Sequence, residues 1–152
     1  MEFETFEARG TSTKMKSLQP TITPFLVVMG GKSAVEFYVT AFGASELVRY
    51  DRPDGKLTSK MVIGGAEFWV GDEEPEFNHF SPFSFGGSAV RIVLTTGTPD
   101  EIYLNALKAG ATQICPVTTE EFWRIGKLED PFGHIWEIGL PVDAELESAA
   151  NE

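Results

Sequence analysis

Charged and aromatic residues stand at alternate positions inside segments that are otherwise strongly apolar. Glu67 and Trp69 share one such segment, Arg91 begins another, and Glu137 lies in the last. Successive side chains of a strand point to opposite faces, so these residues would share one face while the apolar ones pack on the other. A guanidinium can bind the acid group of a small molecule, and an aromatic ring can stack on its body. The pattern predicts the lining of a ligand cavity, with the candidates Thr23, Phe25, Glu67, Trp69, Arg91 and Glu137.

Two copies of one structural unit are expected to position these residues. Residues 65–71 read Gly-Ala-Glu-Phe-Trp-Val-Gly, and residues 133–139 read Gly-His-Ile-Trp-Glu-Ile-Gly. Each copy has a strand, a helix and three more strands by its apolar pattern and turn residues. The expected order is strand 21–28, helix 31–42 and strands near 45–52, 57–64 and 66–71, then strand 88–96, helix 98–109 and strands near 111–118, 120–128 and 134–140. We therefore predict an α+β fold of two pseudo-symmetric modules with the cavity between them.

The chain divides into one domain and two short ends. Its 152 residues, 42% of them hydrophobic, suit a single compact core. We expect a flexible N-terminal extension (1–19), a domain (20–140) and a C-terminal tail (141–152). The modules (20–72 and 88–140) are joined by a linker, 73–87, that holds four phenylalanines. So many aromatic rings predict that the linker packs over a subunit interface or over the mouth of the cavity.

Composition excludes several classes of partner. The formal net charge of −11 argues against nucleic acid and anionic membranes, which need clustered Lys and Arg. No apolar run is long enough to span a membrane, and the acidic N-terminus lacks the apolar region of a signal peptide. The single cysteine, Cys115, cannot form an internal disulfide, which favours a cytoplasmic location. Between Ile114 and Pro116, it is expected to be a buried structural thiol.

An ordered set of motifs resembles the vicinal oxygen chelate superfamily, which includes glyoxalase I, extradiol dioxygenases, and fosfomycin and bleomycin resistance proteins. Its PhnB-like branch is the most similar, and the motifs are Ile22-Thr23-Pro24-Phe25-Leu26-Val27-Val28, Ala41-Phe42-Gly43-Ala44, Ser81-Pro82, Ala109-Gly110-Ala111-Thr112 and Asp130-Pro131-Phe132-Gly133-His134. The resemblance implies two βαβββ modules whose sheets curve into an open, barrel-like cavity. It also implies a homodimer.

Metal-dependent members of that superfamily carry a His or Glu ligand on each of four symmetry-related strands. The corresponding positions hold Thr23, Trp69, Arg91 and Glu137, of which only Glu137 is a plausible ligand. Another strand register would let Glu67 or Asp72 supply one ligand, but Arg91 would remain. His134 is expected to pack structurally, and His79 would bind a metal only if the linker folds inward. We therefore expect no metal-binding residue and no cofactor, and a bound divalent metal is the less favoured alternative.

Arg91 and Glu137 can pair where the cation would sit. Such a pair either only neutralises the cavity floor or leaves Arg91 to bind a carboxylate, phosphonate or sulfate. The resemblance adds Arg124, because PhnB-like relatives often carry an arginine ahead of the final Asp-Pro-Phe-Gly. An exposed cross-strand charge is the alternative for Arg124.

Three functions follow from these observations. The first is a glyoxalase/bleomycin-resistance-like protein that binds a small molecule without the family metal, as a cytoplasmic homodimer. The second is a metal-dependent lyase, isomerase, dioxygenase or transferase, so enzymatic activity stays open. The third is a structural or regulatory dimer with a vestigial cavity.

Overall fold

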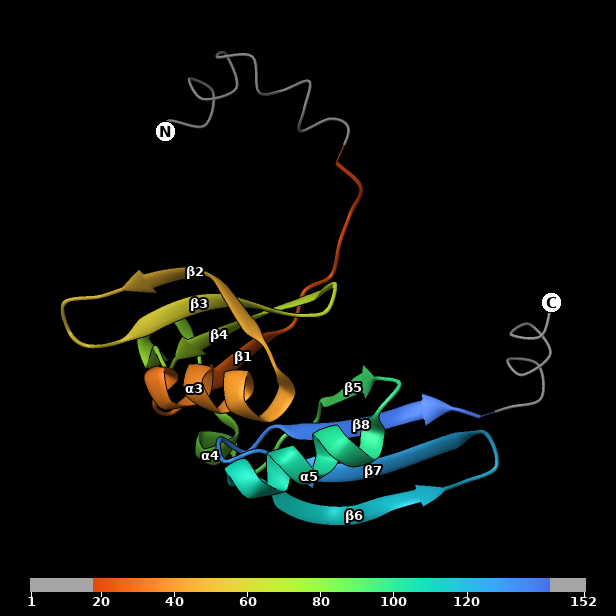
Figure 1. Ribbon diagram of the computed structural model, residues 1–152. Helices are drawn as coiled ribbons and strands as arrows, with labels where there is room; N and C mark the ends of the chain where they lie inside the picture. Colours follow the sequence, from red (N-terminus) through yellow and green to blue (C-terminus); the bar gives the residue numbers. More distant parts are fainter. Residues whose placement is uncertain (1–17, 143–152) are drawn as a thin grey trace.

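The computed structural model describes residues 18–142 and confirms an α+β fold of two βαβββ modules (Figure 1). The first module contains β1 (Phe25–Val28), α3 (Gly31–Phe42), β2 (Ser45–Asp51), β3 (Leu57–Ile63) and β4 (Ala66–Asp72). The second contains β5 (Arg91–Thr95), α5 (Pro99–Ala109), β6 (Thr112–Thr119), β7 (Trp123–Glu129) and β8 (Ile135–Pro141). Between them lie the short helices η2 (Pro75–Phe77) and α4 (Pro82–Phe85). The expected extension and tail fall almost wholly outside the described residues.

Each module forms its own four-stranded sheet. Sheet 1 has the order β1-β4-β3-β2 and sheet 2 the order β5-β8-β7-β6. In both sheets the first pair is parallel and the other two are antiparallel. Helices α3 and α5 contact each other, and no ladder joins the two sheets within residues 18–142 (Figure 1). The sheets therefore do not close into a barrel within one chain. No helix in this part of the chain is long and apolar enough to cross a membrane.

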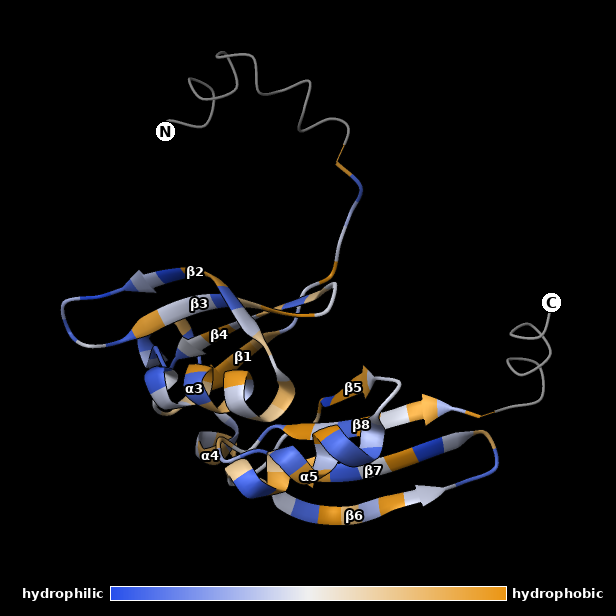
Figure 2. Cartoon of the chain, viewed as in Figure 1, coloured by the Kyte–Doolittle hydropathy of each residue, from blue (hydrophilic) through white to orange (hydrophobic). Residues whose placement is uncertain are grey.

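The core lies between the helices and the inner faces of the sheets. Its largest buried side chains include Trp136, Tyr38 and Met61, and apolar residues run along the central strands while the β2–β3 turn is hydrophilic (Figure 2). The apolar residues of the expected strands mostly face the core, but Ile22 in the expected strand 21–28 and Val90 in the expected strand 88–96 are exposed, at 100% and 64%. Both precede their strands, which begin at Phe25 and Arg91. Pro24 shortens β1 because proline has no N–H for the ladder.

The carboxylate of Asp130 joins the two modules in the core. It is buried and accepts hydrogen bonds from the Tyr38 hydroxyl of α3 at 2.5 Å and from the Trp136 Nε1 of β8 at 2.9 Å. Its other oxygen accepts the backbone N–H groups of Phe132 at 2.9 Å and His134 at 3.0 Å. A buried carboxylate needs such donors, because burial without them is costly. The Asp-Pro-Phe-Gly-His turn therefore acts as a structural joint.

Tyr38 should make the stability of the protein fall at alkaline pH. Burial, and then the adjacent Asp130 carboxylate, raise the pKa of Tyr38 well above its usual value of 10.0. The phenol of the unfolded chain ionises near pH 10, so the stabilisation is complete below that pH. Above about pH 10 this stabilisation is lost, by up to about 1.4 kcal/mol for each pH unit. Urea unfolding between about pH 8 and about pH 11 should show this slope.

Tyr38→Phe should reduce that slope, and it should cost about 1–2 kcal/mol at neutral pH because Asp130 loses one donor. Tyr50→Phe is the matched control, since Tyr50 is exposed. An unchanged alkaline slope in Tyr38→Phe would contradict this account.

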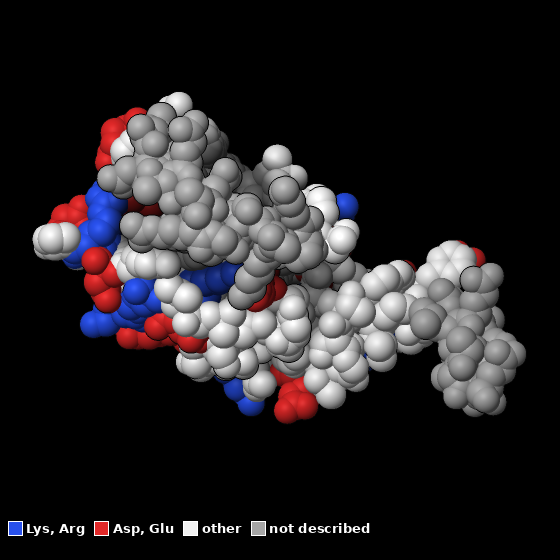
Figure 3. Space-filling model, turned by 90° about the horizontal axis from the view of Figure 1, so that it is seen from above, with Lys and Arg blue, Asp and Glu red and all other residues white. Residues whose placement is uncertain are grey.

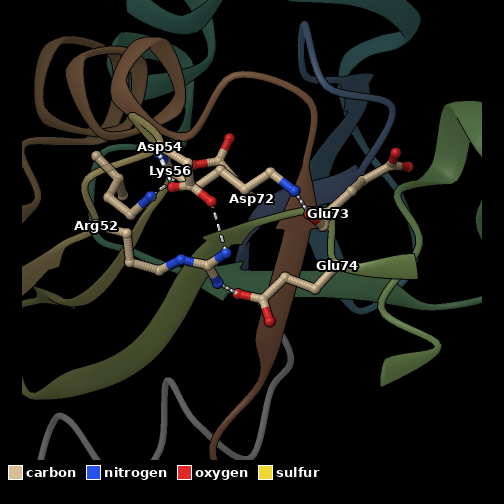
Figure 4. A network of polar contacts seen from close by, with 7 residues as sticks. Arg52, Asp54, Lys56, Asp72, Glu73 and Glu74 are labelled. Atoms are coloured by element: carbon tan, nitrogen blue, oxygen red, sulfur yellow. Dashed lines mark hydrogen bonds and ion pairs between the residues drawn. The ribbon is translucent and has the colours of Figure 1, made fainter. Parts of the chain in front are cut away.

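A polar network fixes the far end of sheet 1 (Figure 4). Asp72 accepts the N–H of Gly31 at 2.7 Å and of Leu57 at 2.8 Å, which ties the start of α3 and of β3 to the end of β4. Around it, Arg52 pairs with Asp54 and Glu74, and the Lys56 ammonium donates to the Glu73 carbonyl. Figure 3 shows acidic and basic side chains interleaved at this end of the molecule. Because its charges are paired internally, the network holds elements in place.

Candidate functional site

The face of sheet 1 opposite α3, called here open face 1, carries an aromatic platform. Phe25 on β1 and Trp69 on β4 are register neighbours, and their rings stack 6.4 Å apart at 11°. The Lys60 ammonium of β3 lies 5.5 Å from the centre of the Trp69 ring and 2.9 Å from the Glu67 carboxylate. The Phe25 side chain is 46% exposed, and Trp69 is half-buried. Such a platform suits a planar molecule, with one cation and one carboxylate beside it.

The linker adds a third ring to this platform. His79 lies 6.3 Å from Phe25 and 6.1 Å from Phe77, measured between ring centres. Part of the linker therefore folds toward open face 1. His79 was expected to bind a metal only if the linker folded inward in this way. Phe83 and Phe85 stay exposed, at 53% and 72%, so the linker also presents rings away from that contact. The two explanations of the linker, interface and cavity mouth, both remain predictions.

The face of sheet 2 opposite α5, open face 2, carries charges instead of an aromatic platform. Glu137 stands at the position equivalent to Trp69, and Val93 at the position equivalent to Phe25. The Arg91 Nη1 donates to Glu137 Oε1 at 2.9 Å, so the pair expected from the sequence is present. Lys127 Nζ lies 3.5 Å from the same carboxylate oxygen. The side chain of Arg91 is 62% exposed, against 32% for Lys127 and 14% for Glu137. The two cations thus stand above a largely buried carboxylate and reach solvent.

Arg124 does not join this group. Its guanidinium makes two hydrogen bonds to the Asp100 carboxylate of α5, at 2.8 and 2.6 Å, and a third to Thr119. Arg124 therefore points toward the helix side of sheet 2, away from Arg91. The hydrogen bonds that Arg124 donates lower the pKa of Asp100, which lies in the first turn of α5. The structure thus gives Arg124 a contact between helix and sheet.

Thr23 and Glu67 line a different hollow. It has a volume of about 570 Å³ and lies between the modules, with Ile92 and Val93 on its other side. Phe25, Trp69, Arg91 and Glu137 do not line it. Two further hollows of about 470 and 200 Å³ lie on open face 2 and share Glu120, Ile125 and Glu137. A single chain therefore does not gather all of the predicted residues in one cavity.

The four positions that the resemblance to the vicinal oxygen chelate superfamily assigns to metal ligands carry side chains that do not fit a metal. Thr23 is a poor ligand, Trp69 offers no lone pair and Arg91 is cationic. Arg91 also occupies an oxygen of the remaining carboxylate, Glu137. Among residues 18–142, no three side chains of His, Cys, Asp or Glu are close enough to form an alternative site. His134 is engaged elsewhere, with its Nε2 2.8 Å from the Val27 carbonyl oxygen.

Cys115 corrects one prediction. The thiol is exposed, not buried between its apolar neighbours. β6 is an edge strand, and its register to β7 shifts on both sides of Cys115. Such irregularities reset which side chains face the core. Cys115 therefore lies beside Lys127, its register partner, on the rim of the 200 Å³ hollow.

Sequence reasoning left Lys60 unassigned and missed Lys127. The structure places them at equivalent positions, because Lys60 is the register partner of Trp69 and Lys127 is that of Glu137. The internal repeat could have revealed this equivalence, because it aligns Trp69 with Glu137. The strand that pairs with each of these residues, β3 or β7, then contributes one lysine to the open face.

No protein-family model matches the chain. The uncharacterized protein Mb0911c of Mycobacterium bovis is 39% identical over 132 residues, which cover 83% of this chain and 86% of that protein. A glyoxylase/bleomycin resistance protein/dioxygenase domain from Frankia superposes with a TM-score of 0.66 at 20% identity, covering 84% of this chain and 96% of the domain. A mutant of the fosfomycin resistance protein FosX from Listeria monocytogenes, solved with Mn(II) and a dihydroxypropylphosphonic acid, superposes with a TM-score of 0.61 at 16% identity, covering 89% and 99%.

Proposed function

Because the chain belongs to one family with Mb0911c and has the fold of the glyoxalase/bleomycin resistance/dioxygenase superfamily, we propose that it binds a small molecule on its two open faces. We assign it to the PhnB-like branch, as a cytoplasmic homodimer that works without the family metal. Binding, not catalysis, is the proposed activity.

One observation carries this proposal: the faces that the helices leave free hold organised, solvent-accessible side chains. Phe25 and Trp69 stack while both stay partly exposed, and Arg91 stands over Glu137 with most of its side chain in solvent. An exposed aromatic platform and a charged cluster that serve no core contact are typical of binding surfaces. A vestigial cavity would not need to keep either.

The dimer is proposed because one chain leaves both faces open. Helices α3 and α5 pack together in the middle of the molecule, so each sheet presents its open face away from that contact. β1 and β5 are edge strands, and no strand pairs with their outer edges within residues 18–142. A second copy that sets its sheet 2 opposite sheet 1 would combine platform and charges in one cavity. Exposed strand edges of this kind favour association.

The metal-free state is proposed on the chemistry of the residues. A divalent cation at the superfamily position would meet the Arg91 guanidinium and a carboxylate that Arg91 already binds. Repulsion and the loss of that pair both oppose loading. A metal-dependent enzyme is therefore the less favoured function.

Elemental analysis of protein purified without chelators or metal-affinity resin tests the metal, and sedimentation analysis tests the dimer. Calorimetry with 2-naphthamide, a planar neutral probe, tests binding. We expect no stoichiometric metal, a dimer, and saturable binding of one probe per open-face pair. Stoichiometric Ni, Zn, Fe or Mn, or failure of planar probes to bind at millimolar concentration, would contradict the proposal.

A further inference from the structure

Resting on the proposed function, we propose that Arg91 and Lys127 form a subsite for a single negative charge, so that the ligand is a planar organic monoanion such as an aromatic carboxylate or sulfonate. The acid group would sit on open face 2, and the ring system on the platform of open face 1. The fold of the superfamily alone predicts neither a binding role for Lys127 nor a ligand with a single negative charge.

The contacts among Arg91, Lys127 and Glu137 on open face 2 are unbalanced in charge. Arg91 and Lys127 both approach Glu137 Oε1, at 2.9 and 3.5 Å, so two cations share one carboxylate. Within residues 18–142, the Lys127 ammonium has no hydrogen-bond acceptor, and Arg91 donates through Nη1 alone. These three side chains, Arg91, Lys127 and Glu137, together carry one unit of positive charge and keep several unused N–H donors. An anion seated between the two side chains would satisfy both.

Open face 1 shows that this imbalance is particular to sheet 2. Lys60 occupies the position equivalent to Lys127, but it has a carboxylate of its own, Glu67, at 2.9 Å. Its remaining neighbour is the ring of Trp69. One cation and one carboxylate leave the Lys60–Glu67 pair neutral. The aromatic body and the acid group of a ligand therefore have separate, complementary surfaces.

The acidic residues around the cluster set the charge of the ligand to one. Glu120 and Glu121 line the hollows beside Glu137, and Glu129 shares a cross-strand row with Arg91 and Ile135. Glu120 accepts a hydrogen bond from Thr118 and, like Glu121, is exposed to solvent, which screens its charge. A monoanion neutralises the surplus of Arg91 and Lys127. A dianion would add a charge that these carboxylates repel.

A matched series of probes tests the inference. Calorimetry should show that wild type binds 2-naphthoate about five- to tenfold more tightly than 2-naphthamide, its neutral isostere, because an acid group gains charge-assisted contacts. Naphthalene-2-sulfonate should bind like the carboxylate, and 2-naphthyl phosphate more weakly. Added NaCl should weaken the binding of 2-naphthoate and leave the binding of 2-naphthamide unchanged.

Variants locate the effect. Lys127→Gln and Arg91→Gln should each lower naphthoate affinity toward that of naphthamide, and should change naphthamide affinity far less than naphthoate affinity. Lys108→Gln, which removes a charge from the exposed end of α5, should keep the preference. Equal binding of naphthoate and naphthamide by wild type, or a preference that survives Lys127→Gln, would overturn the anion subsite while leaving the proposed function intact. Failure of both probes to bind would contradict the proposed function itself, and the subsite with it.

Discussion

Asp130→Ala should lower the free energy of unfolding by roughly 3–5 kcal/mol, a large fraction of the stability of a domain of this size. Four donors converge on this buried carboxylate: the Tyr38 hydroxyl, the Trp136 indole and the backbone N–H groups of Phe132 and His134. Alanine would leave all four without that acceptor in a buried site. The cost of such orphaned donors exceeds the net value of the bonds themselves.

Urea unfolding monitored by tryptophan fluorescence would measure the change. Glu36→Ala is the control, because it removes an exposed carboxylate from the same helix as Tyr38. Asp130→Asn should lie between the two, since it keeps one acceptor oxygen and most of the shape. If Asp130→Ala lowered the free energy of unfolding by less than about 1 kcal/mol, the hydrogen bonds to Asp130 would not contribute substantially to stability.

Much of the fold could be predicted from the sequence. Local signals that agree with tertiary packing are reliable: α3 has the predicted bounds, and its C-cap is Gly43 with φ 68°. Alternation within β4 and β8 separated core residues from open-face residues, because both strands pair regularly on both sides. The Arg91–Glu137 pair was expected from the ligand positions that the family resemblance implies, and the regular pairing of β5 with β8 brings the two side chains together.

Side chains near irregular strand pairing could not be placed in the same way. β2 shifts register between Glu46 and Val48, and β6 shifts on both sides of Cys115. A single extra residue moves every following side chain to the other face. The shifts in β6 accompany the exposure of Cys115, which was expected in the core because its neighbours Ile114 and Pro116 favoured burial. Arg124 lies on the strand opposite the second of these irregularities, and its contact with Asp100 is set by the tertiary approach of α5 to sheet 2.

Gly71→Val should weaken the binding of 2-naphthoate and 2-naphthamide alike, by roughly thirtyfold. A β carbon at Gly71 would lie 2.8 Å from Cζ and 2.9 Å from Cε1 of the Phe25 ring, so the ring must leave its place beside Trp69. Losing one aromatic surface and its stacking geometry costs a ligand about 2 kcal/mol, which corresponds to that factor. The charged cluster of sheet 2 would be untouched.

The pattern of loss distinguishes the two halves of the proposed site. Damage to the platform affects every planar probe, whereas Lys127→Gln affects only the anion. Gly65→Ala is the control for Gly71→Val, because nothing lies within 4 Å of its added β carbon and it sits in the turn before the same strand. If folded Gly71→Val protein bound both probes as wild type does, the ligand would not lie on open face 1. The hollow between the modules, lined by Thr23 and Glu67, would then be the place to search.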